Sequence, residues 1–336
     1  MKTYEIAEPK GIDSLKLVER ATPQPKATEV LVRLRATSLN YRDLVTVKGG
    51  AVTRGIRLPL VPLSDGAGDV VEVGSDVTRF KPGERVVASF FQSWLAGSPH
   101  GSFFRSALGG AMDGTLTEYI ALNEDGLVRI PDYMSCEEAA TLPCAAVTSW
   151  NALVSMGRIT AGETVLVLGT GGVSIFALQF ARMHGARVIA TSSSDAKLTR
   201  LRELGASGVI NYKTTPDWDA RVLEMTGGEG VDHVIEVGGA GTLAKSIRAV
   251  KLGGRISLIG LLGGGGQIDP MPMLLKSVTL QGIFVGSREM FEEMNRAMEI
   301  NNIHPVIDRV FPFAQARDAY RYLESGAHFG KVCIGV

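Results

Sequence analysis

Residues 168–198 of the chain read LGTGGVSIFALQFARMHGARVIATSSSDAKL and contain a glycine-rich turn between an apolar segment and a helical pattern. The turn runs from Gly169 to Ser174, follows a predicted strand and opens a predicted amphipathic helix. Gly169 allows the tight turn, and Gly171 and Gly172 let the backbone approach a pyrophosphate at the positive end of the helix. This stretch therefore predicts a strand–turn–helix unit that binds a dinucleotide. The alternative is a βα turn that binds nothing.

The third glycine usual in such a turn is replaced by Ser174, a small residue that still permits close packing of the helix against the strand. We treat this serine as a mild departure that leaves the expected phosphate contacts unchanged. The turn residues expected to contact the cofactor are Gly169, Thr170, Gly171, Gly172 and Val173.

The second apolar segment ends in three serines, where a dinucleotide site often has an acid that binds the ribose 2′-hydroxyl. An acid there would repel a 2′-phosphate, whereas Ser192 and Ser193 can donate hydrogen bonds to phosphate oxygens. Lys197 and Arg200 can add positive charge, and Tyr212 can add a hydroxyl. We therefore expect NADP(H) rather than NAD(H). The alternative is that the serines only cap the next helix.

Strand and helix patterns alternate through the middle of the chain, which predicts a parallel sheet with helices on both faces. Six strands match a doubly wound dinucleotide-binding architecture. The strand candidates are 164–168, 187–191, 208–210, 232–237, 255–259 and 279–284, and helical patterns include 134–142, 145–156, 196–204 and 242–250.

The first part of the chain has short alternating or apolar segments at 29–35, 68–74 and 84–88, separated by glycine and proline, which predicts a small β-rich domain. The last 50 residues are expected to return to that domain with helices at 289–299 and 313–323 and strands at 307–311 and 332–335. The expected division is 1–128 for the β-rich domain, 129–285 for the sheet domain and 286–336 for the return segment. A ligand crevice is expected between the two domains.

Composition narrows the class of protein. Lysine plus arginine equals aspartate plus glutamate at 35 each among 336 residues, so charge gives no case for nucleic acid or an acidic membrane. We find no apolar stretch long enough to span a bilayer and no signal-peptide pattern at the N-terminus. Three cysteines with no zinc or redox spacing indicate a reducing compartment. We expect a cytoplasmic protein.

Several motifs together give the chain a resemblance to the medium-chain dehydrogenase/reductase superfamily over nearly its whole length. They are LNYRD at 39–43, GAGDVVEVG at 66–74, LPCAAVTSW at 142–150, the glycine turn and FGK at 329–331. The resemblance implies a GroES-like catalytic domain split around a Rossmann domain.

The resemblance also bears on zinc, which divides the family. Zinc-dependent members have a cysteine where this chain has Asn40 and a His-Glu pair where it has Ser64 and Asp65, whereas Cys144 stands at the third ligand position. One thiolate cannot form a three-ligand catalytic zinc site. Residues 91–118, where zinc enzymes carry a four-cysteine lobe, contain no cysteine. We therefore expect no metal and a similarity to NADPH:quinone oxidoreductases and related enone reductases.

The expected reaction is hydride transfer from NADPH to a quinone or an activated carbon–carbon double bond, which needs no metal to polarise it. By resemblance, Asn40 hydrogen-bonds the nicotinamide ribose and Thr148 contacts the nicotinamide. Tyr41 or solvent supplies a proton, although Tyr41 is more readily a packed pocket wall. Further cofactor contacts are expected near Val237, Gly260, Leu261, Phe284, Val285 and Lys331.

Three interpretations remain open. Arg42 and Asp43 can pair and hold the loop of Asn40, and the aromatic segment 91–104 can line an apolar acceptor pocket or pack in place of the missing zinc lobe. The edge segment 277–284 is expected to join two copies into a homodimer. The rival functions are a zinc-free alcohol dehydrogenase or carbonyl reductase, and a cofactor-binding protein without turnover.

Overall fold

The computed structural model describes residues 1–50, 56–260 and 266–336 and divides the chain into two compact units. Unit 1 comprises Met1–Val147 and Val285–Val336, and unit 2 comprises Thr148–Phe284. The first boundary lies later than the expected 128/129. The reason is that helix α2 (Cys136–Ala139) packs against strands β3 (Glu29–Ser38) and β4 (Asp65–Val73) of unit 1.

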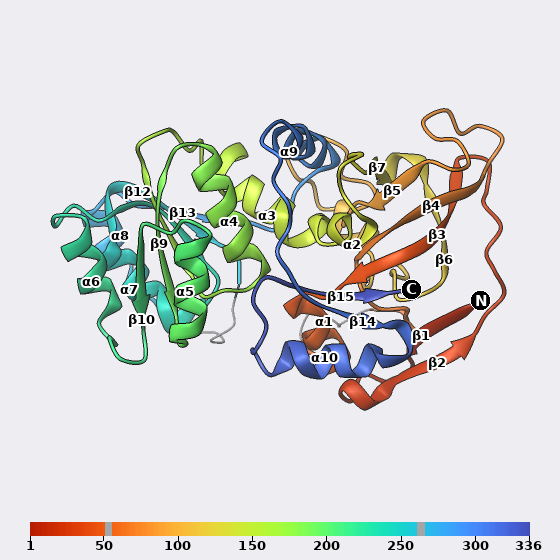
Figure 1. The fold of residues 1–336 in the computed structure, drawn as a ribbon, viewed down its shortest axis with the longest axis horizontal. Coiled ribbons are helices and arrows are strands. Elements are labelled where there is room, and N and C mark those ends of the chain that lie inside the picture. The colour runs from red at the N-terminus through yellow and green to blue at the C-terminus, as the bar shows by residue number, and fades with distance from the viewer. Residues whose placement is uncertain (51–55, 261–265) are drawn as a thin grey trace. The chain divides into compact units, whose positions relative to one another are not determined.

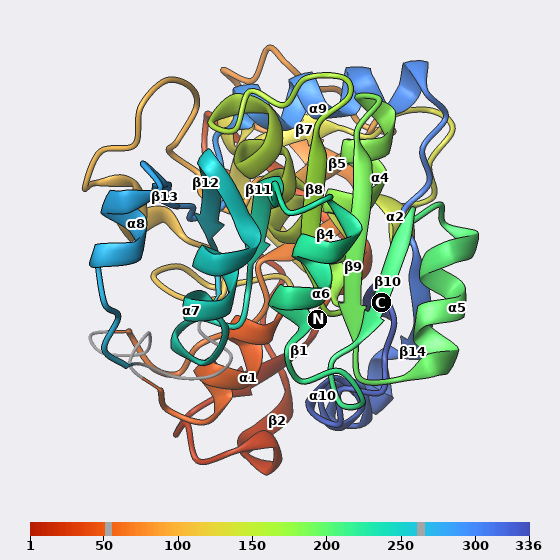
Figure 2. The same ribbon diagram turned by 90° about the vertical axis from the view of Figure 1, so that its left-hand side faces the viewer.

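Unit 2 contains a parallel six-stranded sheet in the order β10-β9-β8-β11-β12-β13 (Figure 2). The strands are β8 (Thr164–Leu168), β9 (Arg187–Ser192), β10 (Gly208–Asn211), β11 (Val231–Glu236), β12 (Val250–Leu258) and β13 (Thr279–Gly282). β8 and β11 pair at the centre, although α4, α5 and α6 and two strands separate them in sequence. The strand order therefore reverses there, and the carboxyl edge at such a point is where open α/β sheets bind ligands.

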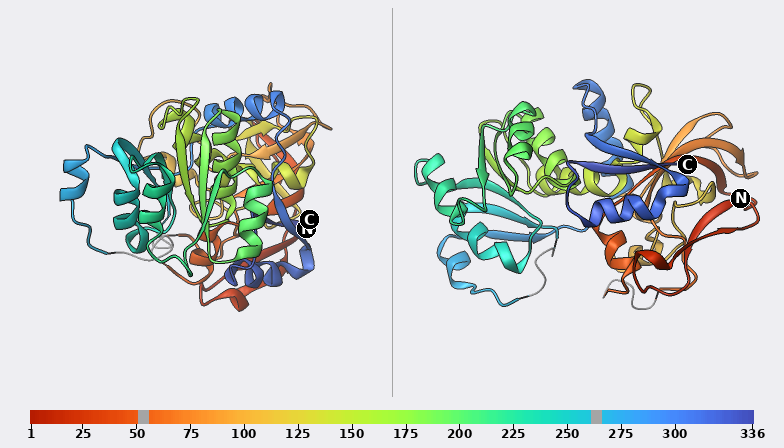
Figure 3. Two further views of the ribbon diagram at one scale, coloured as in Figure 1. Left: turned by 60° about the vertical axis from the view of Figure 1, so that its left-hand side comes forward. Right: turned by 60° about the horizontal axis from the view of Figure 1, so that its bottom comes forward.

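Helices cover both faces of this sheet (Figure 3, left). The helix α4 (Gly172–Met183) packs against β8 and β9, and α5 (Asp195–Glu203) packs against β9 and β10. On the other face, α6 (Trp218–Met225) contacts β10, and α7 (Ala240–Ala249) contacts β11 and β12. A short helix, α8 (Met271–Leu275), precedes the edge strand β13. The expected doubly wound parallel sheet is confirmed.

Unit 1 contains a seven-stranded sheet in the order β14-β15-β3-β4-β5-β7, with β6 paired to β3, and a separate pair β1-β2 (Figure 1). The strands not yet placed are β1 (Lys2–Ile6), β2 (Leu15–Glu19), β5 (Arg85–Ala88), β6 (Tyr119–Asn123), β7 (Leu127–Arg129), β14 (Ile307–Pro312) and β15 (Lys331–Gly335). The helices are α1 (Tyr41–Val47), α2, α9 (Arg288–Ile300) and α10 (Ala316–Glu324). The return segment thus supplies two strands of this sheet.

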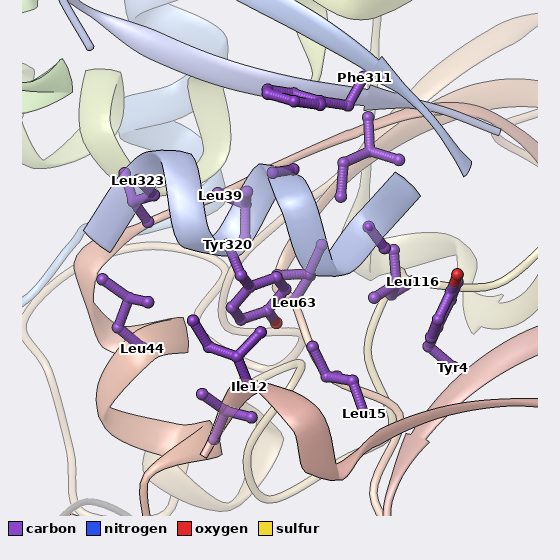
Figure 4. Packing of buried hydrophobic residues seen from close by; sticks show 14 of the residues in the cluster. Tyr4, Ile12, Leu15, Leu39, Leu44, Leu63, Leu116, Phe311, Tyr320 and Leu323 are labelled. Atoms are coloured by element: carbon purple, nitrogen blue, oxygen red, sulfur yellow. The ribbon is translucent and has the colours of Figure 1, made fainter. Parts of the chain in front are cut away.

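One buried cluster connects the first and last parts of unit 1 (Figure 4). Tyr320 on α10 is fully buried among Leu39, Leu44 and Leu63 and the chain near Ile12. Burying large apolar side chains of this kind contributes about 1.5–3 kcal/mol each. The cluster therefore holds α1 against α10, and it fixes the loop from which Asn40 projects.

The segment 134–156 differs from the two continuous helices that the sequence predicts. It forms α2, a π-helical turn at Leu142–Ala146, α3 (Val147–Trp150) and a second π-helical turn at Asn151–Ser155. Pro143 lacks the amide hydrogen that a continuous α-helix requires, so the helix is interrupted there. Within the described ranges, the structure has no helix that combines the length and apolar character of a membrane span.

Candidate active site

The glycine turn of unit 2 is open on the side where a side chain would project. Gly169 has a φ of 75°, and Gly171 is the N-cap of α4. A Cβ placed on Gly169 or Gly171 would meet no atom within 4 Å. The first amides of a helix have no partner within the helix, and its dipole is positive at this end. The turn, with Thr170, Gly172 and Val173, therefore fits a pyrophosphate that contacts backbone.

Ser174 has a structural role that explains why a serine replaces the third glycine. Its hydroxyl donates a hydrogen bond of 2.6 Å to the carbonyl of Leu168, and the side chain is buried. On the other side of the turn, the amide of Gly169 donates to the hydroxyl of Thr191 at 3.3 Å. The end of β8 is thus fixed to both α4 and β9, which holds the turn in shape.

The end of β9 brings together two of the residues predicted to bind a 2′-phosphate. The amide of Tyr212 donates to the carbonyl of Ser192 at 3.1 Å, and the Tyr212 side chain is exposed. Ser192 is buried, and its hydroxyl accepts from the amide of Ser194 at 3.3 Å. Ser193 lies between Ser192 and Ser194 in the sequence, and Lys197 lies in the first turn of α5. Ser194 is the N-cap of α5 but makes no side-chain capping bond. The binding of a 2′-phosphate by Ser192 and Ser193 remains a prediction.

A buried carboxylate organises the carboxyl end of β11. Glu236 is fully buried, and its Oε1 accepts from the amides of Gly238 at 2.7 Å and Gly239 at 3.0 Å and from the Thr242 hydroxyl at 2.6 Å. Its other oxygen accepts a short hydrogen bond from the Ser246 hydroxyl. A buried carboxylate with four donors is well satisfied, so the turn that begins at Val237 is firmly shaped.

The same glutamate also fixes the exit of β12. The backbone carbonyl of Glu236 accepts from the amides of Ile259 at 2.9 Å and Gly260 at 3.3 Å. A Cβ on Gly260 would lie 2.5 Å from the carbonyl oxygen of Val237, so only glycine fits this close approach. Val237 and Gly260 are therefore neighbours, as the predicted cofactor contacts require. Leu261, predicted with them, lies outside the described residues.

In unit 1, strand pairing brings Asp65 and Lys331, which are far apart in sequence, close to Asn40. β3 pairs with β4 so that Ser38 is opposite Asp65, and β3 also pairs with β15. Leu39, directly after β3, donates its amide to the carbonyl of Val332 at 3.0 Å. Lys331, at the start of β15, then reaches the Leu39 carbonyl at 2.7 Å and the Asn40 amide oxygen at 2.6 Å. The predicted contact of Lys331 with ribose or pyrophosphate remains a prediction, and the structure places its ammonium against Asn40.

The residues at the family's zinc-ligand positions do not fit a catalytic zinc ion. Asp65 is fully buried, accepts the Ser64 hydroxyl at 2.6 Å and lies 3.7 Å from the Lys331 ammonium. Burial first, and then the charge of Asp65, raise the pKa of the Cys144 thiol. Among the residues that the structure describes, no three His, Cys, Asp or Glu side chains are grouped to hold a metal.

The residues after Asn40 hold its loop through separate contacts. The Asp43 carboxylate accepts from the backbone amide of Asn40 at 2.7 Å. The guanidinium of Arg42 donates to the carbonyls of Leu108 at 2.8 Å and Gly109 at 3.1 Å. Burial raises the pKa of Asp43 to about 7, although Arg42 acts in the opposite direction. Tyr41 is 52% exposed, and its role as proton donor or pocket wall remains a prediction.

The aromatic segment 91–104 is mainly a packing cluster. Phe91 lies edge-on to Phe103 with ring centroids 4.6 Å apart, and Trp94 lies 4.9 Å from Phe103. All three are buried, whereas Phe104, stacked on Phe103, is 52% exposed. This geometry favours the packing interpretation over an acceptor pocket lined by the whole segment.

Three predicted residues lie at the limits of the two units. Thr148 is buried on α3 and is the first residue of unit 2, and Phe284, which is exposed, is the last. Val285 begins the return segment of unit 1 with a φ of 58°, a conformation that β-branched residues rarely adopt. Their predicted contacts with the cofactor remain predictions.

Two features of the site were missed from the sequence. Glu236 had a possible signal, a carboxylate placed directly before a glycine pair at the end of an apolar strand. The Asp65–Lys331 pair had no local signal, because strand pairing alone brings these residues together.

Comparison with known proteins shows the family of this chain. Residues 26–132 match the family model of the alcohol dehydrogenase GroES-like domain, and residues 172–299 match the zinc-binding dehydrogenase model. A zinc-type alcohol dehydrogenase-like protein of Schizosaccharomyces pombe is 48% identical over 97% of this chain and 96% of its own length. The chain belongs to the medium-chain dehydrogenase/reductase superfamily.

Two further members of this superfamily bear on fold and chemistry. The crystal structure of a putative alcohol dehydrogenase from Sinorhizobium meliloti is 42% identical, with a TM-score of 0.93 over 100% of this chain and 98% of that one. An NADPH-dependent alkenal/one oxidoreductase of Arabidopsis thaliana is 31% identical over 99% of this chain and 79% of its own length. The fold and the oxidoreductase class are thereby established, and the expected resemblance is confirmed.

Proposed function

We propose that the protein is a zinc-independent, NADPH-dependent oxidoreductase that reduces a quinone or an enone. Two features together carry the proposal. Unit 2 has an open glycine turn lined by backbone. In unit 1 the positions of the family's zinc ligands are occupied by Asn40, Ser64 and Asp65, and Lys331 contacts Asn40 and Asp65. Such a chain can bind a nicotinamide cofactor, and among its described residues no three His, Cys, Asp or Glu side chains are grouped to hold a Lewis-acid metal.

Unit 2 supports the cofactor half of the proposal. The α4 amides and the turn Gly169–Val173 would bind the pyrophosphate, and Val237 and Gly260 would contact the nicotinamide half. When bound, the nicotinamide would supply the hydride. Asn40 and Thr148 would orient it, and Phe284 and Val285 would contact it. Because the acceptor is already electrophilic, the protein needs chiefly to orient the reactants and exclude water.

The proton that completes the reduction would come from Tyr41 or from solvent. The Tyr41 hydroxyl is available because the side chain is 52% exposed. A Tyr41→Phe variant separates the two sources, since loss of a proton donor lowers kcat without raising the KM for NADPH.

The preference for NADPH over NADH rests on the end of β9. Ser192 is beside Tyr212, and Lys197 adds charge from α5, so the site offers hydroxyl donors and a cation to a 2′-phosphate. A Ser192→Asp variant should raise the KM for NADPH at least tenfold and change that for NADH less than threefold. If wild type prefers NADH and Ser192→Asp leaves that preference unchanged, the assignment is wrong.

The experiment that tests the whole proposal is a consumption assay for NADPH on chelator-treated protein. Quinones, enones and aldehydes are compared as acceptors. Retained reduction of a quinone or an enone supports the proposal, and loss of activity that zinc restores contradicts it. Binding of NADPH without consumption by any acceptor would favour a cofactor-binding protein without turnover.

The second candidate is a zinc-free alcohol dehydrogenase or carbonyl reductase, favoured by the printed names of the Schizosaccharomyces pombe and Sinorhizobium meliloti relatives. Its signature in the same assay is preferential turnover of aldehydes, or of alcohols with the oxidised cofactor.

We also propose a cytoplasmic homodimer. The three cysteines are unpaired, as in a reducing compartment. β13 lies at one edge of the unit 2 sheet, and Leu274, Leu275 and Leu280 expose apolar surface on or beside it. Sedimentation velocity tests the dimer, and a Leu280→Lys variant should sediment as a monomer.

A further inference from the structure

A buried hydrogen bond joins Lys331 to the side chain of Asn40. Lys331 is 3% exposed, and its ammonium donates to the amide oxygen of Asn40 at 2.6 Å. An ammonium has three donors and no acceptor, so the atom that faces it must be oxygen rather than nitrogen. The contact therefore favours the orientation in which the Asn40 amide oxygen faces Lys331, a choice that the shape of an amide leaves open, and the capping box with the Asp43 backbone favours the same orientation.

The nitrogen of the same side-chain amide is a donor that has no acceptor among the described residues. The Asn40 Nδ2 is enclosed and has no hydrogen-bond partner within residues 1–50, 56–260 and 266–336. An enclosed amide hydrogen without an acceptor costs about 1–3 kcal/mol. That cost is recovered when a ligand brings an acceptor, so the locked orientation suits binding rather than stability.

The ammonium of Lys331 is already committed within unit 1. It donates to the Leu39 carbonyl at 2.7 Å as well as to Asn40, and it lies 3.7 Å from the Asp65 carboxylate. Asp65 balances its charge, and the Ser64 hydroxyl donates to that carboxylate at 2.6 Å. Because two of its three donors are bonded within unit 1 and Asp65 balances its charge, the lysine is placed to orient Asn40 rather than to bind a phosphate itself.

We propose that Lys331 is a positioning residue, which holds the Asn40 amide so that its nitrogen donates to an acceptor oxygen of the nicotinamide cofactor. This inference rests on the proposed function. It assigns the lysine an indirect role in place of direct contact with ribose or pyrophosphate.

A double-mutant cycle distinguishes the indirect from the direct role. The dissociation constant of NADPH is measured by fluorescence titration for wild type, Asn40→Ala, Lys331→Met and the double variant. If Lys331 acts through Asn40, each single variant and the double variant weaken binding by the same factor, about tenfold, equivalent to about 1.4 kcal/mol. A double variant weakened about a hundredfold would mean that Lys331 contacts the cofactor itself. Either that result or a single variant that binds as wild type overturns the proposal.

Two controls separate positioning from damage to the fold. Lys331→Met leaves Asp65 buried without its counter-charge, so Lys331→Met is also combined with Asp65→Asn, which removes that charge. The combined variant should still bind about tenfold more weakly, and a return to wild-type affinity overturns the proposal. Lys276, which donates to the carbonyls of Ile247, Arg248 and Val250 in unit 2, is the matched lysine. Lys276→Met should change the affinity less than twofold, and an equal tenfold loss there also counts against the proposal.

A readout without cofactor reports on the amide itself. The side-chain amide signals of Asn40 in a ¹H–¹⁵N spectrum are assigned by their loss in Asn40→Ala. Wild type should show one pair of signals, and Lys331→Met should shift or multiply them because the amide can turn. Unchanged signals overturn the proposal. If wild type binds neither NADPH nor NADH, the proposed function fails, and these signals still show whether Lys331 locks the amide.

Discussion

Unit 2 offers a ligand mainly backbone, whereas unit 1 offers side chains. In unit 2 the glycine turn presents the amides at the start of α4. Glu236 fixes the neighbouring turn because its carboxylate accepts hydrogen bonds from the amides of Gly238 and Gly239. In unit 1 the Asn40 amide is set by Lys331, which is itself balanced by Asp65. Backbone donors are fixed once the fold forms, but a side-chain donor must be held by further residues. The two units should therefore respond differently to substitution.

The largest effect is expected at the glycine turn. Gly171→Asp adds a carboxylate at the N-cap of α4, where it would repel a pyrophosphate and weaken NADPH binding at least a hundredfold in fluorescence titration. The space is open and aspartate is a good N-cap, so the free energy of unfolding should stay constant or rise by a few tenths of a kcal/mol.

Gly101 provides the matched control for that variant, because a Cβ there also meets no atom within 4 Å. Gly101→Asp should leave NADPH affinity within twofold of wild type. Equal losses for both variants would show that added charge, rather than its place on α4, weakens binding.

The next effect concerns stability in unit 1. The pKa of Asp43 is raised to about 7 by burial, whereas an unfolded aspartate titrates near 4. Between these values unfolding releases a proton, so this group makes stability fall as pH rises. Wild type should therefore lose about 2 kcal/mol more unfolding free energy between pH 5 and pH 8 than Asp43→Asn does. Urea unfolding at both pH values measures the difference, and parallel profiles for the two proteins contradict it.

A smaller effect is expected at Glu236. Glu236→Ala leaves two glycine amides and two hydroxyls without their acceptor, so the turn loosens and NADPH binding should weaken about tenfold. Glu236→Gln keeps an oxygen for the amides, and its nitrogen can donate to Ser246 once that hydroxyl turns from donor to acceptor, so the affinity should remain within threefold of wild type. Titration of both variants tests this, and equal losses would mean that charge, rather than the shape of the turn, is what matters.

The smallest effect is expected in the aromatic segment. Phe104 is half exposed and stacks on Phe103, so Phe104→Ala should reduce the free energy of unfolding by about 0.5 kcal/mol. If the segment serves packing, the KM for a quinone should change less than twofold in steady-state assays. A tenfold rise in that KM would instead place Phe104 in the acceptor site.

Unit 2 was largely predictable because its signals are local. The predicted strand 164–168 coincides with β8, and 187–191 and 208–210 differ from β9 and β10 by one residue at the C-terminal end. The prediction 255–259 missed the first part of β12, because Gly253 and Gly254 interrupt the apolar pattern, and Gly253 has a φ of 71°. The turn between β8 and α4 followed from its glycines.

The site in unit 1 was predictable only in part. Motif resemblance drew attention to Asn40 and Lys331 separately, but these residues are 291 positions apart and meet only because β15 pairs with β3. When the burial of a residue depends on the pairing of strands that are distant in sequence, the neighbouring residues in the sequence do not indicate it. The same reason explains why the sequence showed Asp65 only as a residue at a zinc-ligand position of the family and not as the counter-charge of a lysine.

The place of β15 between β14 and β3 has a consequence for biosynthesis. A ribosome has delivered the whole of Thr148–Phe284 before Lys331 leaves the exit tunnel, so unit 2 can fold on the nascent chain. Until β14 and β15 have been synthesised, the edge of β3 that pairs with β15 in the sheet of unit 1 has no partner. Chaperones that shield unpaired strand edges would therefore engage the early, N-terminal segment rather than the nucleotide-binding one.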